Sequence, residues 1–232
     1  RVRGGVPVRS SNRISTMPTI DLYYLSLSAP CRAVMLTAKA VGVDLNLKKV
    51  DLFAGDHMKP EFVAINPQHC IPTMVDGDLK MWESRAICSY LVSKYGSGDS
   101  LYPTDPTARA KVDSLLYFDM GTLSSRFVNY VVPIIFQGKK ADPEQLKKVH
   151  EALGWLNGYL DGHTWAASNT MTVADHTLVA WVSTFKAGDI CLSKYPNVTA
   201  WLERCESQME GYQELNQEGA TEWGKMFKSK MQ

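Results

Sequence analysis

The sequence predicts an α/β domain built on a mixed sheet, followed by a second domain made only of helices. Strand-like segments rich in β-branched and aromatic residues alternate with helical patterns at first, and strand signals vanish after Trp82. A turn-rich linker, residues 97–106, then precedes a stretch with helical periodicity throughout. At 232 residues the chain is long enough for two cores. The expected domains are residues 17–96 and 107–232.

The first domain begins with a strand, a helix and a second strand. Thr19–Leu25 has the β-branched and aromatic content of a strand. A helix follows, with Pro30 in the first turn, where a missing N–H costs nothing, and Gly42 at its end. Leu45–Val50 is the second expected strand, and residues 53–65 are expected to form a short irregular helix.

A β-hairpin and a helix complete this domain. Two short strands, Thr73–Val75 and Leu79–Trp82, flank Asp76-Gly77, a pair typical of tight hairpin turns. Ser84 is expected to cap a helix whose apolar positions continue at helical spacing to Tyr95. The order β-α-β-α-β-β-α is that of a thioredoxin-like fold, a mixed sheet with helices on both faces.

The second domain is expected to contain four main helices. Apolar periodicity places them at about Thr107–Gln137, Pro143–Leu160, Val173–Ala187 and Pro196–Met209. Pro133 lies inside the first and should kink or end it, because its ring removes one backbone hydrogen bond and clashes one turn back. Thr172 and Asp175 form a capping box at the start of the third helix, and we expect its role to be structural.

Charge and composition argue against several classes of partner. The net charge is +1, but residues 1–16 contain four arginines and no acidic residue, and removing these four from the 25 basic residues leaves 21 against 24 acidic ones. That balance gives no reason to expect nucleic acid or an anionic membrane surface as partner, and no apolar run is long enough for a membrane span. We expect residues 1–16 to be a disordered leader that is not part of the native protein.

The cysteines and histidines predict neither a disulfide framework nor a metal site. Five scattered cysteines, with no CxxC pair and no secretory signal upstream, fit free thiols in a reducing compartment, so a cytoplasmic protein is expected. The five histidines are not at metal-ligand spacing, so no zinc site is expected.

Ser28 is the first candidate catalytic residue. It precedes a helix, where a hydroxyl and the helix dipole can together stabilise a sulfur anion. A free thiol has a pKa near 8.5, so a hydrogen bond that lowers it by about one to three units makes far more thiolate at pH 7. The plainer alternative is that Ser28 is only an N-cap. Cys31 is a rival nucleophile that would point to thiol reductase activity, although we expect it to be a small buried side chain.

Two further motifs predict a pocket for a small charged peptide. Ile71-Pro72 precedes a strand and is expected to be cis, with the backbone N–H and C=O of Ile71 facing an extended ligand. In Glu83-Ser84-Arg85, Glu83 can bind an ammonium group, while Ser84 and the amides of the helix N-terminus can hold a carboxylate. Glutathione, a tripeptide with a thiol, a free ammonium and two carboxylates, would use all three motifs.

These motifs, in this order, resemble the cytosolic glutathione transferases of arthropods, most closely the delta class. The resemblance runs from Pro18 to about Leu215 and rests on the segments DLYYxxxSAPCR, DLFAGDHMKPEF, INPQHCIPT, WESRAI, LYFDMGTL and TVADH. It departs at Ser26-Leu27, where delta members usually carry Pro-Gly, and at Tyr130-Val131-Val132, which replaces a more aromatic run.

The resemblance implies a homodimeric glutathione S-transferase that conjugates glutathione to hydrophobic electrophiles in detoxification, with Ser28 stabilising the thiolate. The implied glutathione-binding residues are Leu52, His57, His69, Cys70, Ile71, Pro72, Glu83, Ser84, Arg85 and Asp119. Asp119 is expected near Arg85 or the partner's glutathione, with an ordinary surface acid as the alternative. The stretches Tyr90–Tyr95 and Leu116–Met120 are expected to contribute to the dimer interface.

An apolar stripe on the long helix is expected to serve partly as core and partly as the electrophile site. The electrophile-site residues are Phe127, Tyr130, Ile135 and Phe136, with Trp223 or Phe227 closing over the pocket. Alternatives remain open: a carrier of hydrophobic ligands with the same fold, a glutathione-dependent peroxidase or thiol reductase, or a structural module like the one in translation elongation complexes. The intact Ser28, His69 and Glu83-Ser84-Arg85 set argues against the last of these.

Overall fold

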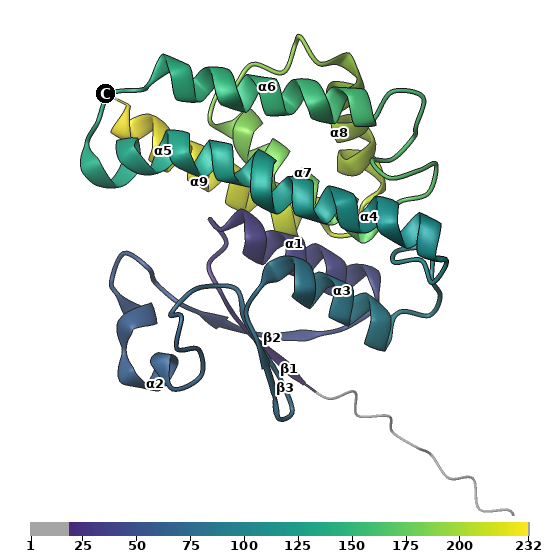
Figure 1. Ribbon diagram of the computed structural model, residues 1–232. Helices are drawn as coiled ribbons and strands as arrows, with labels where there is room; N and C mark the ends of the chain where they lie inside the picture. The colour runs from purple at the N-terminus through teal and green to yellow at the C-terminus, as the bar shows by residue number, and fades with distance from the viewer. Residues whose placement is uncertain (1–18, 232) are drawn as a thin grey trace, which may run out of the picture.

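The computed structural model describes residues 19–231 as an α/β domain packed against a helical domain (Figure 1). The expected leader, residues 1–16, lies outside the described residues. The first domain contains strands β1 (Ile20–Tyr24), β2 (Leu45–Lys49), β3 (Thr73–Asp76) and β4 (Leu79–Met81), a 3₁₀ turn η1 (Asp56–Met58), and helices α1 (Ala29–Ala40), α2 (Pro60–Val63) and α3 (Ser84–Tyr95). The predicted element order is confirmed.

The sheet is mixed, as predicted, with strand order β2-β1-β3-β4. β1 runs parallel to β2 and antiparallel to β3, which pairs antiparallel with β4. Neighbouring residues of a strand point to opposite faces. Leu22 is therefore buried with the α1 side of the core, while Tyr23 meets Phe62 of α2 edge to face, with ring centroids 5.6 Å apart. Helices α1 and α3 pack against each other on the face toward the helical domain.

The second domain consists of six helices and two π-helical turns within the described residues. These are α4 (Pro106–Phe118), η2 (Asp119–Ser124), α5 (Ser125–Gln137), α6 (Pro143–Tyr159), α7 (Val173–Ala187), α8 (Pro196–Gln208), η3 (Gln213–Gln217) and α9 (Glu218–Lys230). Helix α7 is buried on nearly every side and packs against α1, which joins the two domains. Among residues 19–231, no helix is both long enough and apolar enough to cross a membrane.

The long first helix of this domain contains one feature that was not predicted. The helical path from α4 to α5 is continuous but contains the π-helical turn η2. Of the two outcomes expected at Pro133, a kink or an end, the helix does not end there and continues to Gln137. The carbonyl one turn back, which loses its N–H partner, belongs to the exposed Asn129, where water can replace the missing donor.

Helix α9 was not predicted either. Its glycines weaken the helical signal in the sequence, but the packing requires them. A Cβ atom at Gly219 would lie 2.2 Å from the Ser26 carbonyl oxygen, and one at Gly224 would lie 2.4 Å from the Ala187 carbonyl oxygen. Helix α9 therefore docks so closely that only glycine fits at these two positions.

The predicted capping box is present at the start of α7. The Thr172 N–H and hydroxyl both donate to Asp175 Oδ2, at 2.8 Å and 3.2 Å. The Ala166 N–H and the Trp201 indole N–H donate to the other oxygen, each at 2.9 Å. Asp175 is completely buried, so this carboxylate organises the interior of the helical domain in addition to capping a helix.

Candidate active site

Ser28 lies at the N-cap of α1 with an extended backbone, and it is half-buried. Within the described chain its hydroxyl caps no amide of α1; the residue holds its place through its backbone instead. The Ser28 N–H donates to the Leu25 carbonyl at 3.0 Å, and the Ser28 carbonyl accepts from the Arg32 N–H at 3.1 Å. The hydroxyl is thus at a helix N-terminus without the capping bond that the plainer alternative requires.

Cys31, the rival nucleophile, lies one turn into α1 and is completely buried. Burial raises the pKa of the Cys31 thiol to about 11, although a hydrogen bond from Ser28 works in the opposite direction. A thiol with this pKa is protonated at neutral pH and is a poor nucleophile. The structure therefore favours Ser28 over Cys31 as the residue that acts on a bound thiol.

The loop before β3 contains the predicted cis Ile71–Pro72 bond. Asn66, which the sequence analysis did not single out, holds this loop together from a fully buried position. Its side-chain N–H groups donate to the Cys70 carbonyl at 3.0 Å and to the Thr73 hydroxyl at 2.8 Å. Its carbonyl oxygen accepts from the Gln68 N–H at 2.9 Å. A buried amide needs such partners. The sequence alone does not mark Asn66, because these partners become visible only in the folded structure.

The structure brings together two histidines that are twelve residues apart. The ring centroids of His57 and His69 lie 6.2 Å apart. His69 has a positive φ of 42°, an uncommon conformation for a residue with a side chain, so the loop fixes its direction. His57 Nδ1 is buried and has no hydrogen-bond partner among the described residues. Leu52, half-buried, lies in the same segment as His57.

The residue at the N-cap of α3 is Glu83, not Ser84 as expected. Glu83 is the N-cap, with an extended backbone and an exposed side chain, whereas Ser84 is the first helical residue and is buried. The prediction that Ser84 caps this helix is therefore wrong, because the cap is the last residue outside the helix. The Glu83 side chain makes no capping bond either, so side chains at these two positions leave the first amides of α3 available to an anion.

Arg85 connects α3 to the π-helical turn η2. Its Nε lies 2.7 Å from Asp119 Oδ2, and its Nη2 donates to the Ser124 hydroxyl at 3.3 Å. Asp119 is completely buried, which rules out an ordinary surface acid. Burial raises the pKa of Asp119, while the ion pair with Arg85 works against that rise. In a π-helical turn, residues five apart share one face, which explains how Asp119 and Ser124 reach the same guanidinium.

The expected electrophile residues divide into a buried set and an exposed set. Phe127, Trp223 and Phe227 lie in the core, with Phe127 and Trp223 ring centroids 5.3 Å apart and those of Trp223 and Phe227 4.9 Å apart. Tyr130 is buried beside Phe227. The expectation that Trp223 or Phe227 closes over an open pocket is not met, because packing against the helical core has already buried both.

The exposed set consists of half-buried Ile135 and of Phe136, which is 67% exposed. Phe136 stacks on Phe53, which is 59% exposed, with centroids 6.3 Å apart and planes 19° apart. Asp51 fixes the turn that carries Phe53 by accepting from the Phe53 N–H at 2.9 Å. The sequence contains no signal that pairs Phe53 with a residue of the other domain, and it was not predicted.

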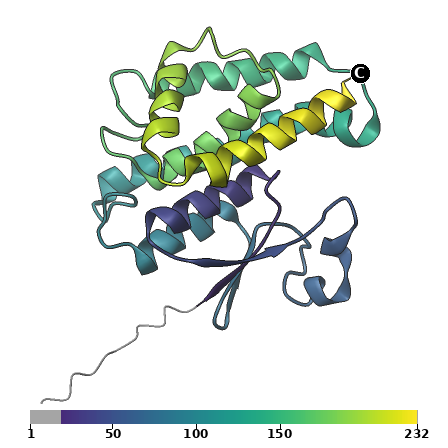
Figure 2. The same ribbon diagram turned by 180° about the vertical axis from the view of Figure 1, so that it is seen from behind.

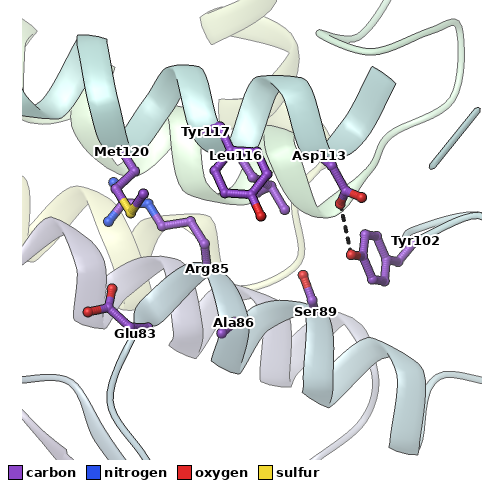
Figure 3. Close-up of a pocket in the computed structure, with 9 residues that line it drawn as sticks. All are labelled: Glu83, Arg85, Ala86, Ser89, Tyr102, Asp113, Leu116, Tyr117 and Met120. Carbon is purple, nitrogen blue, oxygen red and sulfur yellow. Dashed lines mark hydrogen bonds between the residues drawn. The ribbon is translucent and has the colours of Figure 1, made fainter. Parts of the chain in front are cut away.

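A groove of about 600 Å³ lies between α3 and α4 (Figure 3). It is lined by Glu83, Arg85, Ala86, Ser89, Tyr102, Asp113, Leu116, Tyr117 and Met120. Glu83 and Arg85 lie at one end, and Tyr102 donates to Asp113 at 2.8 Å at the other (Figure 3). Tyr117 of α4 and Met120 of η2 are 69% and 44% exposed along the side of the groove opposite α3. The groove therefore includes Glu83 and Arg85, two of the residues expected to bind the peptide.

The stretch Tyr90–Tyr95, expected at a dimer interface, is bound to the sheet within the protomer. The hydroxyls of Tyr90 and Tyr95 and the Lys94 ammonium all reach Asp76 Oδ2, at 2.6, 2.6 and 2.7 Å. Burial raises the pKa of Asp76, but these three donors outweigh it and leave the pKa below its usual value. This cluster fixes α3 on the β3–β4 hairpin.

Comparison with known proteins agrees with this arrangement. A family model described as the glutathione S-transferase N-terminal domain matches residues 19–93, and one described as the C-terminal domain matches residues 115–208. The chain is 46% identical over 212 residues to glutathione S-transferase D7 of Anopheles gambiae, covering 90% of this chain and 97% of that protein.

Solved structures give the same result. A delta-class glutathione transferase of Nilaparvata lugens is 48% identical, with a TM-score of 0.89 over 91% of this chain and 99% of that one. A glutathione transferase homolog of Drosophila mojavensis, solved with bound glutathione, is 35% identical, with a TM-score of 0.88 over 92% of this chain and 98% of that one. With both halves matched and identities of this size, the resemblance to the delta class is confirmed, and the chain belongs to the glutathione S-transferase family.

Proposed function

We propose that this protein conjugates the thiolate of glutathione to hydrophobic electrophiles, and that Ser28 is its catalytic residue. The observation that carries the proposal is the Ser28 hydroxyl at the N-terminus of α1, not used as a helix cap, beside a Cys31 thiol that burial keeps protonated. A hydroxyl can rotate its proton from the weak acceptor Cys31 to an anionic sulfur, which is a stronger acceptor. The N-terminal dipole of α1 adds to this stabilisation.

Glutathione would bind in an extended form along the loop before β3. Among the described residues, Ile71 makes no backbone hydrogen bond, so its N–H and C=O are available to pair with a ligand as one strand pairs with another. At one end, the α3 amides and Ser84 would hold the γ-glutamyl carboxylate while Glu83 binds the ammonium group. At the other end, His57 and His69 would face the glycyl carboxylate.

Asp119 would support the γ-glutamyl end through Arg85. A buried carboxylate 2.7 Å from the guanidinium fixes the direction of the Arg85 side chain. Asp119 therefore acts as a positioning residue in this proposal. Asp119 Oδ1 has no hydrogen-bond partner within the part of the chain that the structure describes, which leaves a second acceptor for Arg85 or for a water molecule.

The electrophile would bind beside Ile135 and the stacked pair Phe53 and Phe136. These two exposed rings come from different domains and together offer an apolar surface. Catalysis then consists of a lowered thiol pKa and of proximity, with no covalent enzyme intermediate. Detoxification in the cytoplasm is the physiological role that we propose for this chemistry.

The groove between α3 and α4 is proposed as part of a homodimer interface. Its exposed side chains, Tyr117 and Met120, are of the types enriched where two proteins meet. The groove also adjoins Glu83 and Arg85, so a second copy seated there would lie close to the bound glutathione.

The test is conjugation of glutathione to a simple aryl halide. Ser28→Ala should lower turnover by about ten- to a thousandfold, which corresponds to loss of a thiolate hydrogen bond of about 1.5–3 kcal/mol. Cys31→Ala, at the buried rival, serves as the matched variant and should retain most turnover in the folded fraction. Unchanged turnover in Ser28→Ala, with loss in Cys31→Ala, would reverse the assignment and favour a thiol reductase.

A further inference from the structure

Arg32 is a buried cation that forms no ion pair with a carboxylate of residues 19–231. It is completely buried in α1, one turn after Ser28. A guanidinium has five N–H donors, and all five are used here. The acceptors are the oxygens of Asn216 at 3.0 Å, of Ser26 and Leu27 at 3.0 Å each and of Ala180 at 2.9 Å, together with the Thr184 hydroxyl. Burial lowers the pKa of Arg32 to about 10, so the group remains charged at neutral pH.

These acceptors come from three segments that are far apart in the sequence. Ser26 and Leu27 are the two residues directly before Ser28. Ala180 and Thr184 belong to α7, and Asn216 belongs to η3. Both elements pack against α1, the purple helix between the sheet and the helical domain in Figure 2. Neither Ser26 nor Leu27 restricts its own backbone as a proline would. The two hydrogen bonds from Arg32 therefore fix their carbonyls, in addition to the bond from the Ser28 N–H to the Leu25 carbonyl that spans both residues.

Two residues of the C-terminal segment, Asn216 and Gly219, contact Arg32 and the loop before Ser28. Asn216 is completely buried, and its side-chain N–H donates to the Ser183 hydroxyl at 3.0 Å, so α7 holds it in place. Gly219 contacts the same loop, since a Cβ atom there would lie 2.2 Å from the Ser26 carbonyl oxygen and 2.9 Å from Arg32 Cδ. Both residues lie beyond position 208, where the match to the C-terminal family model ends.

We infer that Arg32, Asn216 and Gly219 are positioning residues for Ser28. They tie the loop before Ser28 to α7 and to the start of α9, so that the C-terminal segment sets where the Ser28 hydroxyl points. This inference rests on the proposed function of Ser28. A displacement of about 1 Å at a catalytic group can cost on the order of a hundredfold in rate, so a small shift of the loop should reduce turnover strongly.

The experiment uses variants of the contact residues and leaves the buried cation in place. Asn216→Ala removes the acceptor of Arg32 Nε, whereas Asn216→Asp keeps an acceptor there and should restore function. Gly219→Ala pushes directly on the Ser26 carbonyl. Gly224→Ala is the matched control, because it creates the same kind of clash on the same helix but against the Ala187 carbonyl, 2.4 Å from the new Cβ atom.

We expect Asn216→Ala and Gly219→Ala to lower kcat by about tenfold or more while the KM for glutathione stays within about threefold, since the ligand contacts lie elsewhere. The pH profile of kcat/KM should shift to higher pH, because the thiolate is less well stabilised. Gly224→Ala should melt at a lower temperature with an unchanged pH profile, and Asn216→Asp should stay within about threefold of the parent.

Hydrogen exchange of the amides of residues 26–32 provides a readout that does not depend on catalysis. It should be faster in Asn216→Ala and Gly219→Ala than in Gly224→Ala. Parent-like exchange in both loop variants, or a kcat and pH profile within twofold of the parent, would overturn the inference. If Ser28→Ala retains full turnover, the proposed function of Ser28 fails instead, and the positioning assignment falls with it whatever the exchange shows.

Discussion

Asp175→Ala should be among the most destabilising single changes in this protein. The carboxylate accepts four hydrogen bonds in a fully buried site, from the N–H and hydroxyl of Thr172, the N–H of Ala166 and the indole of Trp201. Alanine removes every one of these acceptors at once. Three segments of the helical domain would then lose their common partner.

The magnitude follows from the donors left behind. Losing an N-cap interaction costs about 0.5–2 kcal/mol, and each buried donor without a partner costs about 1–3 kcal/mol. Two backbone N–H groups and one indole N–H are affected, which gives about 3–9 kcal/mol. We expect the lower part of this range, about 3–6 kcal/mol, because alanine also removes the cost of burying a carboxylate. For a protein of this size that lowers the melting temperature by about 6–24 °C. Asp175→Asn keeps one carbonyl oxygen and should lose roughly half as much.

The assay is thermal and urea unfolding beside two matched controls. Asp105 and Asp142 are exposed N-caps of α4 and α6, and each accepts one backbone N–H, at 2.8 Å and 2.9 Å. Their alanine variants should lose only about 0.5–2 kcal/mol. The kinetic constants of folded Asp175→Ala should be near those of the parent. A loss no greater than in the controls would refute the role of the buried donors, and parent stability with lost turnover would place Asp175 in the active site.

Three more outcomes follow from the structure. Glu83→Gln and Ser84→Ala should act mainly on the KM for glutathione, because they bind the end remote from sulfur; a KM within twofold of the parent in both would show a merely structural motif. Burial lowers the pKa of His176 to about 4, below its ordinary value of 6.5, so as pH falls the unfolded chain protonates this histidine before the folded protein does. The free energy of unfolding should therefore be unaffected by His176 above pH 6.5 and should fall by ~3 kcal/mol as pH falls toward 4. Urea unfolding at several pH values measures this loss, and His176→Asn should remove it. Tyr117→Glu should shift sedimentation toward the monomer while Tyr159→Glu, an exposed tyrosine outside the α3–α4 groove, should not; equal behaviour would contradict the proposed interface.

The fold could be predicted wherever the signal is local. Strand composition, the Asp76-Gly77 turn and the prolines at helix starts each act within a few residues, and these elements were predicted within one or two positions. Helix α9 and the turn η2 could not be predicted in this way. The glycines of α9 are explained only by carbonyls of Ser26 and Ala187, which belong to other parts of the chain.

The residues of the candidate site could likewise be predicted only where the signal is local. Ser28, His69 and Glu83 belong to short motifs whose chemistry is visible in the sequence. Asn66 and Arg32 were missed because a buried polar side chain is recognised only by its partners. For Arg32 these partners lie as far as 184 residues away, at Asn216.

The turn η2 is a place where the long helix can change its length by one residue and keep its packing. A π-helical turn holds one residue more than an α-helical turn, so it absorbs an extra residue without changing the faces that α4 and α5 present to the core. Deleting the exposed Gly121, which has open space around it, would let α4 run into α5 as one regular helix with Phe127 and Ile134 still facing the core. The same deletion inside α5, where no wide turn absorbs it, would rotate the residues beyond it by about 100° relative to α4.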